Sequence, residues 1–286
     1  MKPTLVDVTL MSEKRTNVLM LLYCKGKKNI DEIKNTLDVS SSGIMPQMKK
    51  LVECDLLIHE KDTYELSDMG KLIVEKMQDL LSLSTLFEEN HDYWKNRDLS
   101  KIPIHMLRRI SELGQCSLLE PDRHHLFEHH PEFIEKIHDS KYVMMISSSF
   151  HPQTMSVLCD AAEKDIGVSF IVTRSVFDRM EEDCQNELER FHNCEHTELV
   201  IDNEEEEIGL LTLAVSDIFV YIWLFDKNQR FNRITLISYD ESALNWGKEL
   251  FMYYRNLATA VDKDNEIDYC NHGSNLITQN VDNSVS

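Results

Sequence analysis

The sequence predicts an α+β protein of two domains, an N-terminal winged helix-turn-helix and an α/β domain with a mixed sheet. Residues 1–80 follow the order helix, helix, turn, helix and hairpin, whereas residues 100–262 alternate strand-like with helical runs. A chain of 286 residues, 42% apolar and 28% charged, is typical of a globular protein with about two cores. We expect a linker helix over 81–99 and a disordered tail over 263–286, where apolar residues become sparse.

The first two helices are predicted from their caps. Ser12 precedes an apolar run that ends at a basic, glycine-containing turn over residues 25–28. Asn29 opens the second helix, and Glu32 follows three residues later, as in a capping box. We expect this second helix to stop at Asp38.

A third helix follows the polar turn over residues 38–43. Because Pro46 has no N–H to donate, this helix is expected to begin around residues 42–45. Strand-like runs over 56–58 and 64–66 then predict a hairpin. The apolar side chains of the third helix share one arc of the helical wheel: Ile44, Met45, Met48, Leu51 and Val52.

The polar side of the third helix is the candidate DNA-reading surface, because winged domains place such a helix in the major groove. A glutamine can pair with an adenine edge, whereas lysines more often hold phosphates, so Gln47 is expected to carry more sequence information than Lys50. Two alternatives are an ordinary amphipathic helix with a solvated face and a winged helix used for protein contact. The candidate DNA-binding residues are Ser41, Ser42, Gln47, Lys49 and Lys50 on the helix and Lys61, Thr63 and Tyr64 on the wing.

The formal net charge of −20 is unevenly distributed along the chain. Residues 1–80 hold 12 Lys and Arg against 13 Asp and Glu, whereas residues 81–286 hold 18 against 37. DNA phosphates repel an acidic surface, so any contact with double-stranded DNA must use the first domain.

The second domain is predicted to contain a strand-helix-strand unit, which implies parallel pairing of its two strands. A helix to about residue 164 lies between those strands, and a helical stretch over 175–192 follows the second one. Asp240 is expected to cap the last helix. We expect strands at 142–146, 168–172, 197–201, 209–215, 218–225 and, closing the sheet, 234–238.

Polar residues follow the ends of the two parallel strands, where ligands bind in α/β sheets because strand ends and helix N-termini converge there. Both loops could line one cleft, with Trp223 and Tyr221 of the later hairpin as walls, although an aromatic core is the alternative for these two. Simple helix capping by serine and threonine is the equally weighted alternative. The candidate ligand-binding residues are Ser147, Ser149, His151, Thr173 and Trp223.

No cofactor, metal or membrane partner is expected. The histidine pairs His124/His125 and His129/His130 have no carboxylate or cysteine placed to complete a metal site, and the seven cysteines are scattered without C-x-x-C spacing. The sequence contains neither an apolar run of ~18–20 residues nor a signal-peptide pattern, so we expect a cytoplasmic protein.

Six segments of the chain carry a resemblance to known proteins. They are residues 12–15, 46–51 and 64–70 in the first domain and 150–152, 171–173 and 246–254 in the second. These segments resemble the archaeal transcription regulators of the methanogenesis-regulatory type. The resemblance runs in order from about residue 5 to 260, and its last segment is also similar to sugar-sensing TrmB-type regulators. It implies a winged-helix DNA-binding domain followed by a phospholipase D-like sensor domain.

We therefore expect a homodimeric DNA-binding transcription regulator whose second domain senses a small-molecule effector and alters the spacing of two recognition helices. The alternatives are a non-catalytic protein-interaction module and a phospholipase D-like hydrolase. The H-x-K-x4-D pattern that this hydrolytic chemistry requires is absent from the sequence, so we expect no enzyme. The sequence leaves open the effector, the operator, the direction of regulation and any redox role of a cysteine.

Overall fold

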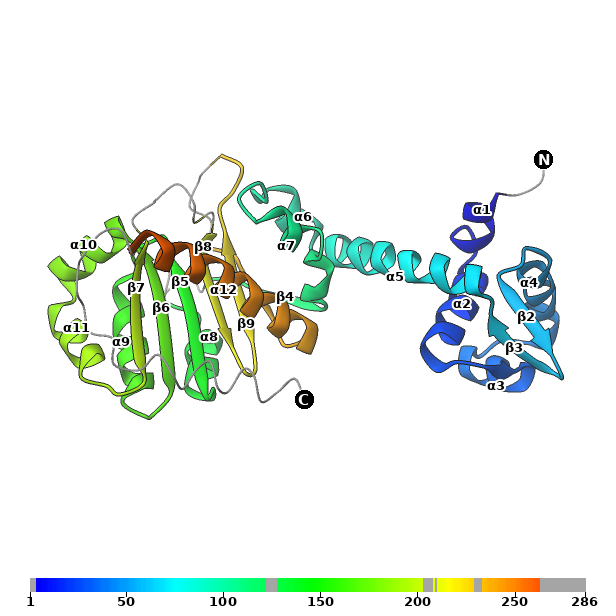
Figure 1. The fold of residues 1–286 in the computed structure, drawn as a ribbon, viewed down its shortest axis with the longest axis horizontal. Helices are drawn as coiled ribbons and strands as arrows, with labels where there is room; N and C mark the ends of the chain where they lie inside the picture. Colours follow the sequence, from blue (N-terminus) through cyan, green and yellow to red (C-terminus); the bar gives the residue numbers. More distant parts are fainter. Residues whose placement is uncertain (1–3, 122–127, 203–207, 209, 229–232, 263–286) are drawn as a thin grey trace. The chain divides into compact units, whose positions relative to one another are not determined.

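The structure is a computed structural model that describes residues 4–121, 128–202, 208, 210–228 and 233–262. It has a mixed α+β fold, as predicted, and divides into two compact units, residues 1–85 and 86–286 (Figure 1). The tail predicted to be disordered lies outside the described residues.

Four helices precede the hairpin of the N-terminal unit. The first was not predicted from the sequence, and it begins with a capping box between Thr4 and Asp7. The capping box predicted for Asn29 and Glu32 is present, with backbone-to-side-chain hydrogen bonds of 2.8 and 2.9 Å. The helices are α1 (Leu5–Thr9), α2 (Glu13–Lys25), α3 (Ile30–Leu37) and α4 (Ser41–Glu53).

Helix α4 begins earlier than the position of its proline predicted. Ser40 is the N-cap, its Oγ accepts from the backbone N–H of Gly43, and the helix starts at Ser41. Pro46 consequently lies in the second turn rather than at the start. The missing proline N–H would have bonded to the carbonyl of Ser42, which is exposed, so the loss is tolerated there.

A three-stranded sheet completes the winged domain. Strand β2 (Leu57–Glu60) and strand β3 (Thr63–Leu66) form the predicted hairpin. Lys61 and Asp62 both have positive φ, 47° and 66°, which is the backbone of a tight two-residue turn. Strand β1 (Lys28–Asn29) pairs with β3 and was not predicted, because two residues are too few to show a strand pattern.

Helix α5 (Asp68–Glu89) begins after Ser67, whose Oγ accepts from the backbone N–H of Gly70 at 2.9 Å. Gly70 is required here because a Cβ would stand 2.2 Å from the carbonyl oxygen of Leu56. The start of α5 is thus packed directly on the hairpin. The core of the unit joins α2, α3, α4 and the hairpin, and its fully buried residues include Val18, Leu19, Ile33, Ile44, Met48, Leu51 and Val74.

The second unit is built on a seven-stranded mixed sheet of order β4-β10-β9-β8-β5-β6-β7. Strands β5, β6 and β7 are parallel, and the remaining pairs are antiparallel. The parallel pairing predicted for the strand-helix-strand unit is confirmed. The strands are β4 (Cys116–Leu119), β5 (Tyr142–Ser147), β6 (Gly167–Thr173), β7 (Thr197–Asp202), β8 (Leu210–Ser216), β9 (Val220–Leu224) and β10 (Thr235–Ser238).

One expectation for this unit was wrong, and one was met with a break. Strand β10 does not close the sheet, because β4 pairs along its outer edge. The helical stretch predicted over 175–192 is two helices, α10 (Arg174–Asp183) and α11 (Gln185–His192), which break at Cys184 because its φ and ψ of −134° and 33° are not helical.

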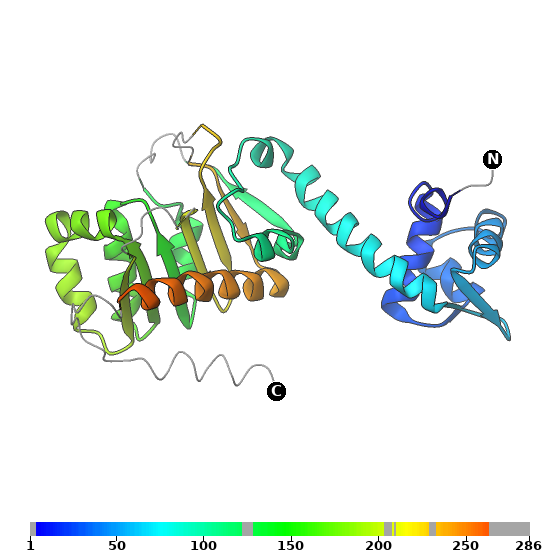
Figure 2. The same ribbon diagram turned by 45° about the horizontal axis from the view of Figure 1, so that its top comes forward.

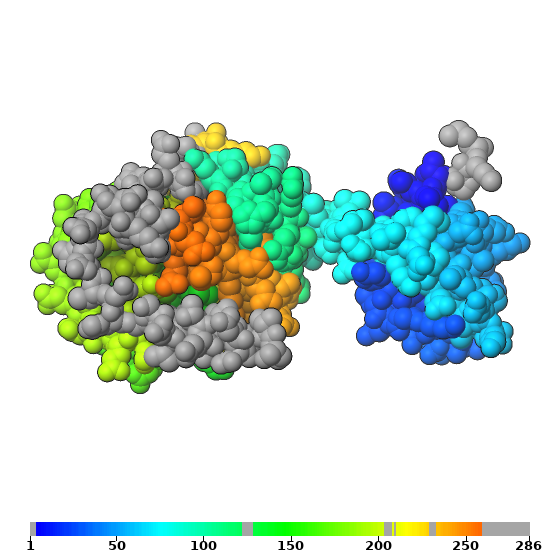
Figure 3. Space-filling view, viewed as in Figure 1, coloured from blue at the N-terminus to red at the C-terminus, as the bar shows by residue number. Residues whose placement is uncertain are grey.

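Helices cover both faces of the sheet (Figures 1 and 2). On one face lie α8 (Pro131–His138), α9 (Pro152–Ala162), α10 and α11, which share a core with the strands. On the other lies α12 (Glu241–Asp262), whose outer side forms part of the surface (orange in Figure 3). A Cβ on Gly247 of α12 would stand 2.9 Å from the side chain of Val215 in β8, so helix and sheet are in close contact.

Short helices connect α5 to the sheet. They are α6 (His91–Lys95), α7 (Ile104–Leu107) and the 3-10 helix η1 (Ile110–Leu113). Just after α6, the guanidinium of Arg97 is only 2% exposed and donates to the carbonyl oxygens of Leu224 and Ile234, each at 3.3 Å. It also lies 4.2 Å from the ring centroid of Tyr93. Arg97 therefore fixes the segment after α5 to strand β9 and to the residue before β10.

Candidate functional site

The N-terminal end of α4 presents hydroxyl groups and a positive charge to solvent. Ser41 and Ser42 are exposed, and Ser40 Oγ lies 3.3 Å from Ser42 Oγ. The ammonium of Lys14, from α2, lies beside Gly43 in the first turn of α4. A helix N-terminus with hydroxyls and a lysine suits a phosphate oxygen. Lys14 was missed as a candidate because only the fold brings α2 next to this turn.

Gln47 is held by a neighbouring helix rather than standing alone on the surface of α4. Its side-chain oxygen accepts a 2.7 Å hydrogen bond from Nη1 of Arg15. Arg15 also donates to the carbonyl oxygens of Val8 at 2.6 Å and Asp7 at 3.0 Å. This fork ties α1, α2 and α4 together and leaves the amide nitrogen of Gln47 as its hydrogen-bond donor. The sequence contains no local signal for this contact, since 32 positions separate the two residues.

Lys49 and Lys50 extend the basic side of α4. Lys49 is exposed and forms a 3.7 Å ion pair with Glu53, one helical turn away. Such an exposed pair contributes only ~0.3–0.5 kcal/mol, so a phosphate can displace the glutamate readily. Lys50 is half-buried, and its charge contributes to lowering the pKa of Asp7, after the larger effect of the hydrogen bonds from Thr4.

The wing offers fewer DNA-contacting groups than the sequence predicted. Lys61 is exposed at the tip of the hairpin, and Thr63 Oγ1 donates to the carbonyl oxygen of Glu60 at 2.6 Å. Tyr64 is only 6% exposed and stacks on His59 with ring centroids 4.2 Å apart, so its side chain belongs to the core. Alternation along β3 explains this placement, because Tyr64 and Leu66 share the inward face.

In the second unit, the loop that follows β5 is held by a hydrogen bond between its own residues. Ser147 Oγ is buried and donates to the carbonyl oxygen of Ser149 at 2.8 Å. With His151 these serines line only a narrow space beneath α9 and α10. Thr173 does not contribute to that space, because its hydroxyl caps α10 by accepting from the N–H of Val176. Within the described residues, Thr173 thus lies outside the space that Ser147, Ser149 and His151 line.

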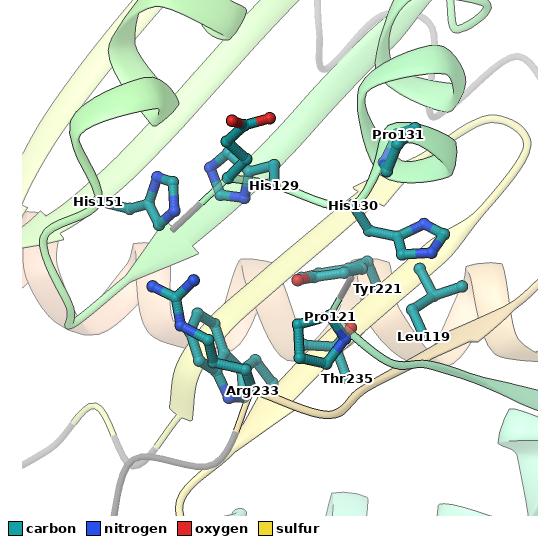
Figure 4. Close-up of a pocket in the computed structure, with 11 residues that line it drawn as sticks. Leu119, Pro121, His129, His130, Pro131, His151, Tyr221, Arg233 and Thr235 are labelled. Atoms are coloured by element: carbon teal, nitrogen blue, oxygen red, sulfur yellow. The ribbon is translucent and has the colours of Figure 1, made fainter. Parts of the chain in front are cut away.

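A larger cavity, of about 170 Å³, opens beside this loop. Figure 4 shows imidazoles along one side and the side chains of β9 and β10 opposite them. His151 and Trp223, both predicted from the sequence, line it. Tyr221, also expected as a wall, lines it too. The other lining residues were missed because they come from separate segments: Leu119, Pro121, Glu128, His129, His130, Pro131, Arg233 and Thr235.

Burial controls the charge of the cavity's central histidine. Burial, then the charges of His151 and Arg233, lowers the pKa of His129 to about 3. Its Nε2 shares a 2.9 Å hydrogen bond with Thr154 Oγ1, and its ring stacks on that of His151 with centroids 3.9 Å apart. His129 is therefore a neutral imidazole at physiological pH.

The opposite wall joins a phenol and a guanidinium. Burial raises the pKa of Tyr221 to about 12, although a hydrogen bond with Thr235 and the charge of Arg233 oppose this rise. Burial lowers the pKa of Arg233, whose group is nevertheless charged at any physiological pH. The cavity thus combines the positive charge of Arg233 with the neutral ring of His129 and the phenol of Tyr221, and the carboxylate of Glu128 also lines it.

Among the described residues, no group of three or more His, Cys, Asp or Glu is arranged to hold a metal ion. His124 and His125 lie outside the described part of the chain. Within that part, too, no helix is long and apolar enough to cross a membrane.

Two consecutive domain models of one family match the chain. The N-terminal domain of methanogenesis regulatory protein FilR1 matches residues 5–84, and the middle domain of the same protein matches residues 126–257. Together they cover well over half of the sequence and include both the α4 surface and most of the cavity.

Two curated relatives are similar. Methanogenesis regulatory protein FilR1 of Methanothrix harundinacea (strain 6Ac) is 24% identical over 263 residues, which are 90% of this chain and 58% of that protein. HTH-type transcriptional activator ArnR of Sulfolobus acidocaldarius is 33% identical over 76 residues, 26% of this chain and 28% of ArnR. The chain thus spans little more than half the length of the first relative.

Solved structures give weaker likenesses. TrmBL2, an archaeal chromatin protein, has a TM-score of 0.41 at 13% identity, with 89% of this chain and 96% of that chain covered. Polyphosphate kinase from Porphyromonas gingivalis has a TM-score of 0.33 at 14% identity and covers 54% of this chain and 27% of its own. Neither score reaches 0.5, so no statement about this chain rests on them.

Proposed function

This chain belongs to the FilR1 family of methanogenesis regulatory proteins, and we propose that it regulates transcription by binding double-stranded DNA through helix α4. The observation that carries this proposal is the outer side of α4 in a helix-turn-helix. There, the exposed Ser41, Ser42 and Lys49 stand on a helix whose opposite side is buried through Ile44, Met48 and Leu51. A helix of this kind enters the major groove with its N-terminal residues near the base edges.

We assign different roles to the polar groups of α4. Ser41, Ser42 and Lys14 surround the positive end of the helix dipole and suit one phosphate. Lys49 and Lys50 add two further charges along the same helix. Gln47 is the base-reading residue, and Arg15 fixes its orientation, so that its amide N–H donates to an acceptor in the groove.

We further propose that the protein is a homodimer and that its second unit changes DNA affinity when an effector binds. Helix-turn-helix dimers read half-sites about one DNA turn, ~34 Å, apart, so a small change between subunits alters affinity. Leu72 and Leu80 of α5 are 68% and 49% exposed, and a second copy would cover them. Light scattering on the full chain tests this, and a monomer at micromolar concentration contradicts it.

The test of the DNA-binding surface is a fluorescence anisotropy titration of the full chain against the DNA upstream of its own gene. The double variant K49A/K50A should bind at least tenfold more weakly. The matched control, K71A/K76A, removes two charges from α5 in the same unit and should bind as the parent does. Equal affinity of K49A/K50A and the parent overturns the assignment of α4.

A second titration tests base reading by Gln47. Q47A should lose discrimination between the upstream DNA and a shuffled sequence, since phosphate contacts remain while a base contact is lost. Unchanged discrimination in Q47A overturns its role.

A further inference from the structure

The cavity of the second unit has two chemically distinct ends. One end is apolar and includes Leu119 and Pro131 (Figure 4), and Pro121 and the ring of Trp223 add apolar surface to the cavity. The other end holds the guanidinium of Arg233 with the imidazoles of His129 and His151 (Figure 4). A ligand complementary to both ends has a compact apolar body and one polar, negatively charged group.

The imidazoles of the polar end are fixed by other contacts. His129 is 8% exposed, its backbone N–H donates to Gln153 Oε1 at 2.9 Å, and its ring is stacked on that of His151 and packs at a tilt against that of Phe133. In Figure 4 the Arg233 side chain extends toward the same two histidines. The two imidazoles are held in place before a ligand arrives, which reduces the entropy lost on binding.

The charge at this end favours an anion. Arg233 is half-buried at the cavity, where screening by water is weaker than at the surface. Its positive charge helps to keep His129 neutral, so a second cation is disfavoured there, whereas an anion is attracted. The positive charge of Arg233 differs from the overall charge of the second unit, in which acidic residues outnumber basic ones about two to one.

The size of the cavity limits the ligand to a small molecule. Its volume of about 170 Å³ is close to the ~150 Å³ that accommodates a benzene-sized body in a protein interior. A guanidinium binds a carboxylate through two parallel hydrogen bonds, and an indole ring covers a flat apolar group well.

We propose that this cavity binds a small organic carboxylate, with the carboxylate on Arg233 and the apolar body against Trp223. The proposal deepens, and rests on, the effector-responsive regulation proposed above. Ile234, which directly follows Arg233, accepts a 3.3 Å hydrogen bond from Arg97. A ligand on Arg233 therefore changes the position of Ile234 and, through it, of Arg97. Because Arg97 anchors the segment after α5, this is how binding in the cavity would affect the DNA-binding unit along the chain.

The test measures binding without DNA, on the full chain. Benzoate and butyrate are titrated by calorimetry and by tryptophan fluorescence, and benzamide and butyramide serve as neutral partners of the same shape. At least one carboxylate should bind in the micromolar to low millimolar range, at least tenfold more tightly than its amide. R233Q should lose this preference, whereas R108Q, which removes an exposed arginine of the same unit, should keep it.

Three outcomes overturn the proposal. They are no binding of either carboxylate at 10 mM, equal binding of carboxylate and amide, and inorganic phosphate binding as tightly as the better carboxylate, since the apolar end would then contribute nothing. R233K, which keeps the charge but not the fork of donors, should bind more weakly than the parent and more tightly than R233Q. Equal affinities of R233K and R233Q would also contradict the role of the guanidinium.

A separate arm distinguishes this proposal from DNA binding. The parent is titrated with its upstream DNA in the absence and presence of the bound carboxylate. DNA binding that is unaffected by a carboxylate that does bind rejects the regulatory link through Arg97 but leaves the cavity as a carboxylate site. Absence of any DNA binding rejects the function proposed for α4 and leaves the calorimetry to decide the cavity on its own.

Discussion

Replacing His129 by glutamine should remove a defined part of the acid sensitivity of the second unit. In the folded protein the pKa of His129 is about 3, because the ring is buried beside His151 and Arg233. In the unfolded chain a histidine has a pKa of about 6.5. Between these two pH values the unfolded chain binds a proton that the folded protein does not. The stability contributed by the neutral ring is therefore complete above about pH 6.5 and decreases as the pH is lowered below that value.

The expected size follows from those two pKa values. From pH 7 to pH 5 the free energy of unfolding should fall by about 2 kcal/mol through this one group, because the unfolded histidine becomes protonated and the folded one does not. His129→Gln keeps a polar partner for Thr154 Oγ1 but cannot titrate in this range. Its stability should therefore depend less on pH by about that amount.

Urea unfolding followed by tryptophan fluorescence measures this directly, since Trp94, Trp223 and Trp246 all lie in the second unit. Midpoints at pH 7 and pH 5 are compared for the parent, H129Q and H192Q, the last of which removes an exposed imidazole from α11. If H129Q loses as much stability on acidification as the parent, the imidazole is not held neutral by burial and the reasoning is refuted.

Two further predictions concern packing and thiol reactivity. Gly70→Ala should destabilise the N-terminal unit by about 2 kcal/mol, since its Cβ would meet the backbone oxygen of Leu56, and an unchanged thermal melt by circular dichroism would contradict this. Ellman's reagent should modify exposed Cys24 rapidly and Cys159 only after unfolding, because burial raises the pKa of Cys159 to about 12. Loss of both thiols at equal rates in the folded protein would contradict the second prediction.

The local patterns of the sequence were sufficient for most elements. The hairpin of the wing, the cap at Asn29 and the parallel pairing of β5 with β6 are set by turn residues, capping residues and apolar runs close to each other in the chain. Strand β4 was missed because nothing local distinguishes the run over 116–119 until β10 pairs with it.

The candidate sites were harder to predict from the sequence than the secondary structure, because they depend on contacts between residues that lie far apart in the chain. Gln47 lies on the polar side of α4, but its hydrogen-bond partner Arg15 lies on another helix and could not be predicted. Thr173 was predicted to bind ligand, yet it caps α10, as the alternative interpretation had it. Arg233 lies two residues before β10. It lines the cavity only because the strand order places β10 beside β9, which the sequence does not show.

The most direct measurement of the central claim is the salt dependence of DNA affinity. We predict that the affinity for upstream DNA falls steeply between ~50 and ~200 mM salt, and that K49A/K50A lowers the slope of log affinity against log salt by about 2, one for each lost phosphate contact. An affinity that does not change with salt, or a slope that is the same in K49A/K50A and the parent, would show that α4 does not hold DNA.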